Sequence, residues 1–338
     1  MFAPKSSAAA GPRSGVPPLR RAWRPGLIWL WLAAGCLFFG GAAVRGKETN
    51  AIPKTPRPFY IIGHGANTLA EAGEYLAAGA NGLEVDVNQL DGRTNVLCIG
   101  HGPDVGTGAA GKQHSVPLAE FLQGLHQMAR TNGHFCLVYF DCKTLAATPE
   151  LGAVLLDNIR THLTGTDDDR VDLIALISVG KLREKAMFAN IAQQLGPREG
   201  VMVDGYSDPV AVSGFFTGSG VANQAFCDGI VPFNPFMSEF EDYGSVRKAC
   251  RLRDAQHQIR FVGTWSVNNP WWMTKYIRMG VDGIVVDRRF VWYNFCWSNM
   301  GHGLHSLAKI LRGQGTSLGI RPAERADNPF ANPGPAAR

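Results

Sequence analysis

The 338-residue sequence lacks a strong charge of either sign. Its formal net charge is +5, and charged residues make up 18% of the chain. Basic residues are concentrated before the first apolar run, at Lys5, Arg13, Arg20, Arg21 and Arg24, so the remainder is close to neutral. Proteins that bind nucleic acids present clustered basic surfaces. The charge therefore gives nucleic-acid binding no support, and we expect no nucleic-acid partner.

Two short motifs are also missing. No Asn-x-Ser/Thr sequon occurs, so N-glycosylation is not expected. No Gly-x-Gly-x-x-Gly follows the first expected strand, which weakens a doubly wound, nucleotide-binding sheet as the fold.

The one long apolar run is "GLIWLWLAAGCLFFGGAAV", from Gly26 to Val44. It follows the basic stretch and ends in small residues, which is the layout of a secretory signal. We expect residues 1–46 to be a signal peptide and the rest to be secreted. An uncleaved signal-anchor is the alternative, because the run is long enough to span a bilayer. The protein would then be membrane-tethered on the extracellular side.

Cleavage would leave an even number of cysteines: Cys98, Cys136, Cys142, Cys227, Cys250 and Cys296. An oxidising compartment permits disulfide bonds among them, but their pairing cannot be read from the sequence. Some are expected to be free core thiols, the commoner fate in a domain of this size.

Apolar runs alternate with helical patterns along most of the chain. The expected strands are 59–64, 82–87, 135–141, 173–179, 200–206, 229–234, 259–267 and 283–287. The helical patterns are 67–79, 117–130, 149–163, 181–195, 241–257, 270–279 and 290–312. This alternation predicts an α/β fold, a single (β/α)₈ TIM barrel over residues 57–312. The Gly- and Pro-rich residues 313–338 are expected to be an irregular tail.

Carboxylates occupy strand positions where apolar residues would be expected. Glu84 and Asp86 in "GLEVDV" share one face of a strand, and Asp141 ends the strand "FCLVYFD". Three carboxylates at a barrel mouth would repel one another without a cation, and oxygen ligands favour Mg²⁺ over zinc. We therefore expect a magnesium site, with structural ion pairs at the rim as the alternative.

Two histidines flank these carboxylates in the sequence. His64 and His101 are each followed by Gly at a strand exit, and a pair of imidazoles suits proton transfer during phosphoryl transfer. The alternative is that each is a hydrogen-bonded structural histidine. Lys143, two residues after Asp141, is a candidate to bind a phosphate oxygen or is simply exposed. Trp265 is a candidate to bind a quaternary ammonium or is a core aromatic.

These segments resemble a known family. "GHGANTLAEAGEYLAAGANGLEVDV", "IGHG", "VYFDCKT", "TWSVN" and "GVDGIVVD" are similar, in order, to the sphingomyelinase D/phospholipase D toxins of spider venoms and their relatives. The resemblance covers about Phe59 to Asp287. It places the protein among the glycerophosphodiester phosphodiesterase-like barrels.

The resemblance implies roles for each candidate. His64 and His101 become the catalytic pair, Lys143 the phosphate contact, Trp265 the choline contact, and Glu84, Asp86 and Asp141 the Mg²⁺ ligands. The implied reaction is transphosphatidylation, in which a hydroxyl of sphingomyelin or lysophosphatidylcholine attacks phosphorus and choline leaves. A monomer acting at membrane or lipoprotein surfaces is expected. The "DNPF" stretch ending at Phe330 is similar to an Asp-Asn-Pro-Trp tail motif and is expected to cap the closed end.

The sequence also departs from those toxins. The loop "HGPDVGTGAAGK" has no cysteine, Gly100 stands where a tyrosine usually precedes the second histidine, and Asn268 replaces an Asp. All three are expected to affect the substrate mouth. A glycerophosphodiester phosphodiesterase using water is an alternative, although "GHGANT" lacks that group's His-Arg-Gly and Pro-Glu-Asn-Thr. A non-catalytic lipid-binding or membrane-tethered barrel is the third.

Overall fold

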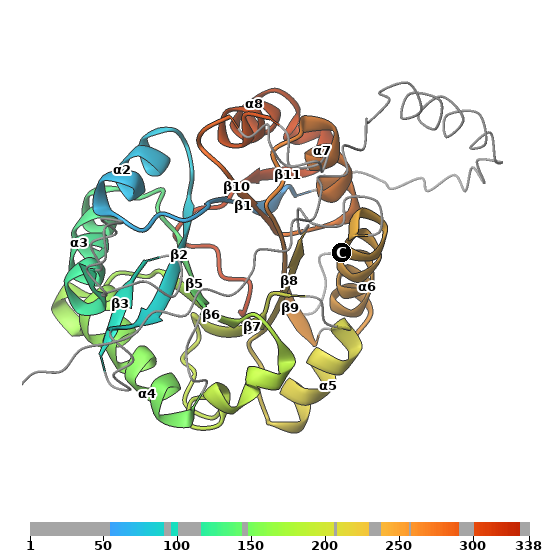
Figure 1. Ribbon diagram of the computed structural model, residues 1–338. Coiled ribbons are helices and arrows are strands. Elements are labelled where there is room, and N and C mark those ends of the chain that lie inside the picture. Colours follow the sequence, from blue (N-terminus) through green and yellow to red (C-terminus); the bar gives the residue numbers. More distant parts are fainter. Residues whose placement is uncertain are drawn as a thin grey trace, which may run out of the picture. The chain divides into compact units, whose positions relative to one another are not determined.

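The chain from residue 55 onward folds into a parallel β-barrel surrounded by helices (Figure 1). The computed structural model describes residues 55–90, 96–100, 116–143, 148–205, 208–229, 238–256, 258–290 and 301–331. The eight barrel strands are β1 (Arg57–Gly63), β2 (Gly82–Gln89), β5 (Leu137–Cys142), β6 (Ile174–Val179), β7 (Glu199–Val203), β8 (Gln224–Gly229), β9 (Ile259–Trp265) and β10 (Gly283–Val286). Pairing of β1 with both β2 and β10 closes the barrel. The predicted (β/α)₈ fold is confirmed.

Three short strands extend this sheet. β3 (Leu97–Ile99) pairs antiparallel with β2 and with β4 (Val116–Pro117), and β11 (Ile320–Pro322) pairs with β1. The outer helices are α2 (Leu69–Ala77), α3 (Leu118–Thr131), α4 (Pro149–Asn158), α5 (Pro209–Gly218), α6 (Ser238–Gln256), α7 (Pro270–Met279) and α8 (Gly303–Gln314). Short helical turns are η2 (Ile159–Thr164), η3 (Asp167–Asp169), η4 (Leu182–Phe188) and η6 (Thr316–Leu318).

The prediction was wrong around the sixth barrel strand. It placed this strand at 229–234 and no helix before it, whereas α5 occupies Pro209–Gly218 and β8 begins at Gln224. Gly and β-branched residues give α5 a weak helical pattern, and capping by Asp208 with Pro209 at the first turn compensates. β8 was not predicted because its sequence contains the polar residues Gln224 and Asp228. Both are buried, where Gln224 donates a hydrogen bond to Val221 O and Asp228 accepts one from Ser245.

The tail is more ordered than its composition predicted. η6 and β11 follow α8, and Ala323 N donates to Phe59 O at 2.9 Å. Phe330 is buried among the side chains that fill the barrel, including Leu137, Met202 and Phe261. The Gly and Pro residues therefore lie at the ends of short elements, and the segment is ordered at least as far as residue 331.

Two predictions concern residues that the structure does not describe, or describes only in part. The predicted signal segment, residues 1–46, lies outside them, and so does Cys296. In the described ranges, no helix combines the length and apolar character needed to cross a bilayer. Five cysteines are described, and all are buried free thiols: Cys98, Cys136, Cys142, Cys227 and Cys250. The disulfides permitted by the sequence are thus not formed among these five.

Candidate active site at the carboxyl end of the barrel

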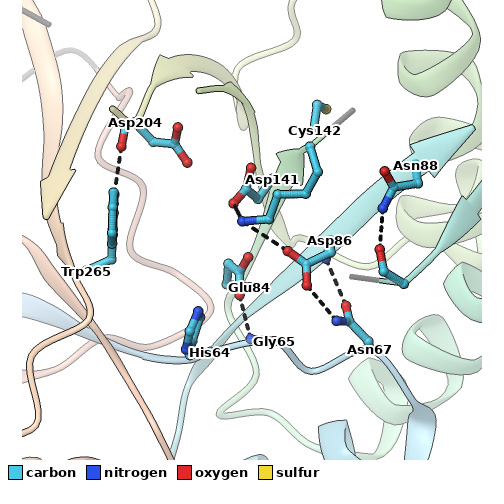
Figure 2. Close-up of polar contacts among 12 residues, drawn as sticks. His64, Gly65, Asn67, Glu84, Asp86, Asn88, Asp141, Cys142, Asp204 and Trp265 are labelled. Carbon is cyan, nitrogen blue, oxygen red and sulfur yellow. Dashed lines mark hydrogen bonds and ion pairs between the residues drawn. The ribbon is translucent and has the colours of Figure 1, made fainter. Parts of the chain in front are cut away.

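Three carboxylates meet at the carboxyl ends of two neighbouring strands. Asp86 of β2 pairs in register with Asp141 of β5, and Glu84 lies two residues earlier on the same face of β2. Ligand oxygens of Glu84, Asp86 and Asp141 all lie within 4.8 Å of one another, and all three residues are buried. Figure 2 shows their side chains directed into a common space. The structure thus brings together the three residues that the sequence singled out.

The segment after β1 supports two of these carboxylates. Gly65 N donates to Glu84 Oε2 at 2.5 Å, and Asn67 Nδ2 donates to Asp86 Oδ2 at 2.6 Å. Asn67 Oδ1 in turn accepts a hydrogen bond from Asp86 N at 2.9 Å. Gly65 has a φ of +60°, a conformation that glycine adopts without steric cost. The turn therefore fixes how both carboxylates point.

Lys143 is the cation closest to the carboxylates in the described part of the site. Its Nζ forms an ion pair with Asp141 and lies 3.2 Å from Asp86 Oδ1. These neighbours raise the pKa of Lys143 although burial opposes its charge. The lysine is therefore held as an ammonium among the carboxylates.

One lysine does not neutralise three carboxylates. Burial, and then repulsion from Asp86, raises the pKa of Glu84 to about 8. Burial, and then the charge of Asp204, raises the pKa of Asp141 to about 7. Both carboxyl groups thus bind protons more readily than exposed carboxyl groups do when no cation neutralises them. A hard divalent cation fits this set, because its oxygen ligands are buried, clustered and electron-rich.

His64 follows β1 and is held from behind by an acidic side chain. Its Nδ1 lies 2.7 Å from Asp287 Oδ1, which follows β10. Burial opposes protonation, but this hydrogen bond and the negative charges of Glu84 and Asp287 raise the pKa of His64 to about 9. Nδ1–H donates to Asp287, so the ring has a fixed orientation and Nε2 is left for other partners. The geometry is that of an oriented acid–base histidine.

Asn268 completes this arrangement. Its Nδ2 donates to Asp287 Oδ2 at 2.5 Å, and its Oδ1 accepts from Asp287 N at 2.9 Å. The side chain is fully buried. Asn268 therefore lies behind Asp287 and orients it, so any effect on the substrate mouth would act through Asp287 and His64; that effect stays a prediction.

Trp265 ends β9 beside a fourth carboxylate. Its Nε1 donates to Asp204 O at 2.7 Å (Figure 2). The Asp204 side chain accepts a hydrogen bond from Tyr139. Burial raises the pKa of Asp204. Trp265 is partly exposed, with its ring edge tied to the backbone after β7. It lies on the opposite side of the carboxylates from Asn67 in this view.

His101 lies outside the described residues, so the structure does not place it. Its neighbour Gly100 is described: Gly100 N donates to Asp86 O at 3.0 Å, and Gly100 O accepts from Asn88. The chain therefore passes beside β2 immediately before His101.

Several supporting residues were missed in the sequence: Asn67, Tyr139, Asp204, Asn268 (noticed only as a departure) and Asp287. Asp204 and Asp287 each follow a barrel strand, so the rule that found Asp141 would have found them too. Asn67 and Tyr139 carry no comparable signal, because their partners are set by three-dimensional contacts.

Comparison with curated proteins finds spider toxins. A toxin named dermonecrotic toxin LarSicTox-alphaIB1ai, from Loxosceles arizonica, is 27% identical over 278 residues, covering 74% of this chain and 86% of the toxin. LrSicTox-alphaIA1ii from Loxosceles reclusa is 22% identical over 282 residues, 77% of this chain and 89% of the toxin. LgSicTox-alphaIC1 from Loxosceles gaucho is 26% identical over 148 residues, 41% of this chain and 52% of that toxin.

Solved structures give more distant matches. A glycerophosphodiester phosphodiesterase from Parabacteroides distasonis has a TM-score of 0.48 at 17% identity, covering 69% of this chain and 94% of that one. A phosphodiesterase from Oleispira antarctica, solved with sn-glycerol-3-phosphate, has a TM-score of 0.47 at 17% identity, covering 67% of this chain and 92% of that one.

A family-level comparison covers the whole barrel and the ordered tail. The family described as "Dermonecrotic toxin SPH" matches residues 54–330, from three residues before β1 through Phe330. This range contains the carboxylate cluster, Lys143, His64 and Trp265. The resemblance inferred from the sequence is confirmed, and the chain belongs to the dermonecrotic toxin SPH family.

Proposed function

We propose that this protein is a secreted, Mg²⁺-dependent phospholipase D that releases choline from sphingomyelin or lysophosphatidylcholine and forms a cyclic phosphate. The observation that carries the proposal is the meeting of three buried carboxylates within 4.8 Å, beside Lys143 and His64. Membership of the toxin family supports it, because the matched residues include this whole cluster.

Glu84, Asp86 and Asp141 would hold the metal. Bound Mg²⁺ supplies positive charge that stabilises the negative charge developing on phosphate oxygens. Lys143 adds a point charge from the chain itself, since its ammonium is already held among these carboxylates. Gly65 and Asn67 keep Glu84 and Asp86 oriented through their hydrogen bonds.

Two histidines would move the protons. One takes the proton of the substrate's own hydroxyl as that oxygen bonds to phosphorus. The bond from phosphorus to the choline oxygen breaks, and the other histidine donates a proton to that oxygen. Asp287 leaves Nε2 of His64 available for one of these transfers. The role of His101 rests on its sequence position.

Trp265 would receive the choline group. A quaternary ammonium binds to the face of a tryptophan ring, and a neighbouring carboxylate increases the attraction. The hydrogen bond from Trp265 Nε1 to Asp204 O fixes the ring beside Asp204. The cationic headgroup would therefore lie between Trp265 and the carboxylates.

Two other functions make different predictions. A glycerophosphodiester phosphodiesterase would use water and give a linear phosphate. A non-catalytic lipid-binding barrel would bind choline lipids and leave them intact. The oriented His64 and the clustered carboxylates favour catalysis over simple binding.

Phosphorus NMR of the full chain with sphingomyelin and with lysophosphatidylcholine separates these functions. We expect a cyclic phosphate with Mg²⁺ and no turnover with EDTA. His64→Ala should abolish turnover, whereas His134→Ala, at an exposed position, should not. A linear product would favour water as nucleophile. Intact lipid from the folded wild-type protein would contradict catalysis on these substrates.

A further inference from the structure

Exposed large apolar side chains gather at one end of the barrel. In the described ranges they are Leu69, Val96, Val210, Trp271 and Phe290. Each follows the carboxyl end of a barrel strand: three begin α2, α5 and α7, one precedes β3 in the connection from β2, and one follows β10. Parallel strands end on a common rim, so all five share the end that holds the carboxylate cluster.

The two aromatic residues of this set lie on adjoining loops. Trp271 is 58% exposed and Phe290 is 52% exposed. Phe290 packs on the His302 ring with centroids 4.8 Å apart. Gly301, next to His302, lies against the backbone of Asn268, and Asn269 Oδ1 accepts from Trp271 N at 2.9 Å. A continuous set of contacts therefore joins the two aromatics.

Basic side chains accompany these aromatics. Lys275 Nζ lies 3.3 Å from the ring centroid of Trp271 and 4.6 Å from that of Trp272. Arg289, adjacent to Phe290, is exposed, while Arg288 pairs with Glu74. Tryptophan beside lysine or arginine is the composition of surfaces that reside at a lipid–water interface.

We propose that this rim docks on the surface of a choline-phospholipid membrane, with Trp271 and Phe290 entering the interface. Lys275 and Arg289 complement the charge of lipid phosphates. The inference rests on the proposed function, which requires a lipid substrate to reach the carboxylates.

The distribution of the apolar residues favours a lipid surface over a protein partner. They project from the connections after β1, β2, β7, β9 and β10, and four of these strands, β9, β10, β1 and β2, are neighbours in the barrel, so the residues lie along the rim around the carboxylate cluster. A lipid surface on this rim presents its headgroups directly to the carboxylates, whereas a protein partner seated there would close the site to lipid. A second copy seated on this rim would also cover the carboxylate cluster.

Sedimentation with vesicles of phosphatidylcholine and sphingomyelin, in EDTA to prevent turnover, tests the docking surface. Trp271→Ala should weaken binding of the full chain about tenfold, the order expected when one large side chain no longer leaves water. Phe215→Ala is the matched control, since it removes an aromatic–lysine pair, with Lys185, from the outer wall. Equal weakening in both variants would overturn the proposal.

The apolar run at 26–44 can itself bind lipid, so sedimentation alone does not show which residues enter the membrane. A second measurement therefore locates Trp271 directly. Acyl-chain-brominated lipids quench tryptophans that enter the interface. We expect quenching of the emission that is lost in Trp271→Phe. A vesicle-bound protein whose Trp271 emission is not quenched would overturn the proposal, as would a dimer in solution that Trp271→Ala dissociates.

Turnover separates this inference from the proposed function. Short-chain lysophosphatidylcholine below its micellar concentration reports chemistry without docking. Trp271→Ala should lose about tenfold more activity on vesicles than on this monomeric substrate. Quenching of Trp271 without turnover of either substrate would remove the proposed function and leave the docking surface. Turnover of monomeric lysophosphatidylcholine without binding to vesicles would support the proposed function and overturn the docking surface.

Discussion

Asp287 is the residue on which the orientation of His64 depends. It accepts hydrogen bonds from the imidazole and from Asn268, and these contacts lower its pKa although burial opposes ionisation. The carboxylate therefore stays charged beneath His64. Asn268 contributes both a donor and an acceptor, so an isosteric change from amide to carboxylate tests the arrangement without altering its shape.

Asn268→Asp should destabilise the protein by about 2 kcal/mol, because it removes a buried donor and faces Asp287 with a like charge. Adding Asp287→Asn should recover much of that loss, since position 287 then supplies the amide donor and position 268 the carboxylate acceptor. Urea unfolding of the wild type, of the two single variants Asn268→Asp and Asp287→Asn, and of the double variant measures this. A single Asn268→Asp variant as stable as the wild type would contradict the described contacts.

The carboxylate cluster predicts how stability depends on pH. The pKa of Glu84 rises from an ordinary 4.5 to about 8 in the folded state, and that of Asp141 from 3.8 to about 7. The folded state therefore binds protons more tightly than the unfolded state. This contribution is fully present below about pH 4 and is lost as pH rises through 7 to 8.

In EDTA the melting temperature should consequently fall between about pH 4.5 and pH 8, and Glu84→Gln should flatten that fall. Mg²⁺ should restore stability more at pH 8 than at pH 5, because the cation competes with protons for the same oxygens. Scanning calorimetry across this range provides the measurement. A melting temperature that rises with pH in EDTA would show that the carboxylates are not coupled as described.

The sequence predicted the carboxylates of this site better than the residues that orient them through hydrogen bonds. Glu84, Asp86 and Asp141 are conspicuous because carboxylates seldom occupy buried strand positions. Asn67 and Asn268 are common loop residues, and their importance comes from the carboxylates that they contact. Such partners depend on how loops from distant strands meet, which a residue pattern does not encode.

The helix α2 connects the site to the outer wall of the barrel. Thr68 Oγ1 accepts from Glu71 N at 3.1 Å, and Glu71 Oε2 accepts from Thr68 N at 3.1 Å. The N-cap of this capping box, Thr68, directly follows Asn67, and the helix begins at Leu69. Its start was predictable, whereas α5 was not, because the α5 sequence contains glycine and valine at positions where strong helix formers are usual.

Thr68→Ala should therefore lower the free energy of unfolding by about 1 kcal/mol, the usual cost of losing an N-cap side chain. Thr68→Ser keeps the hydroxyl and should stay close to the wild type. Urea denaturation of both variants distinguishes capping from a general effect of substitution. Equal losses in the two variants would assign the effect to the threonine methyl group instead.

At the scale of the whole molecule, the two ends of the barrel have separate tasks. The carboxyl end carries the charged cluster, and the tail is joined to the amino end. Asn81 Nδ2 donates to Ala323 O at 3.1 Å, and Arg321 pairs with Asp327 at 2.7 Å. Composition identified the tail, and the buried Phe330 adds apolar packing to these contacts that order it.

Phe330 packs directly on Gly200 of β7, where a Cβ atom would lie 2.2 Å from its Cζ. Phe330→Ala should cost about 3–5 kcal/mol, because it leaves a cavity in the barrel interior. Gly200→Ala should also destabilise the wild type, since the new methyl group meets the ring. In the Phe330→Ala background that methyl group enters the vacated space, so the second substitution should cost far less. Unfolding free energies of the four proteins close this cycle. Additive losses would mean that the ring and the glycine do not touch, and that the tail does not fill the amino end of the barrel.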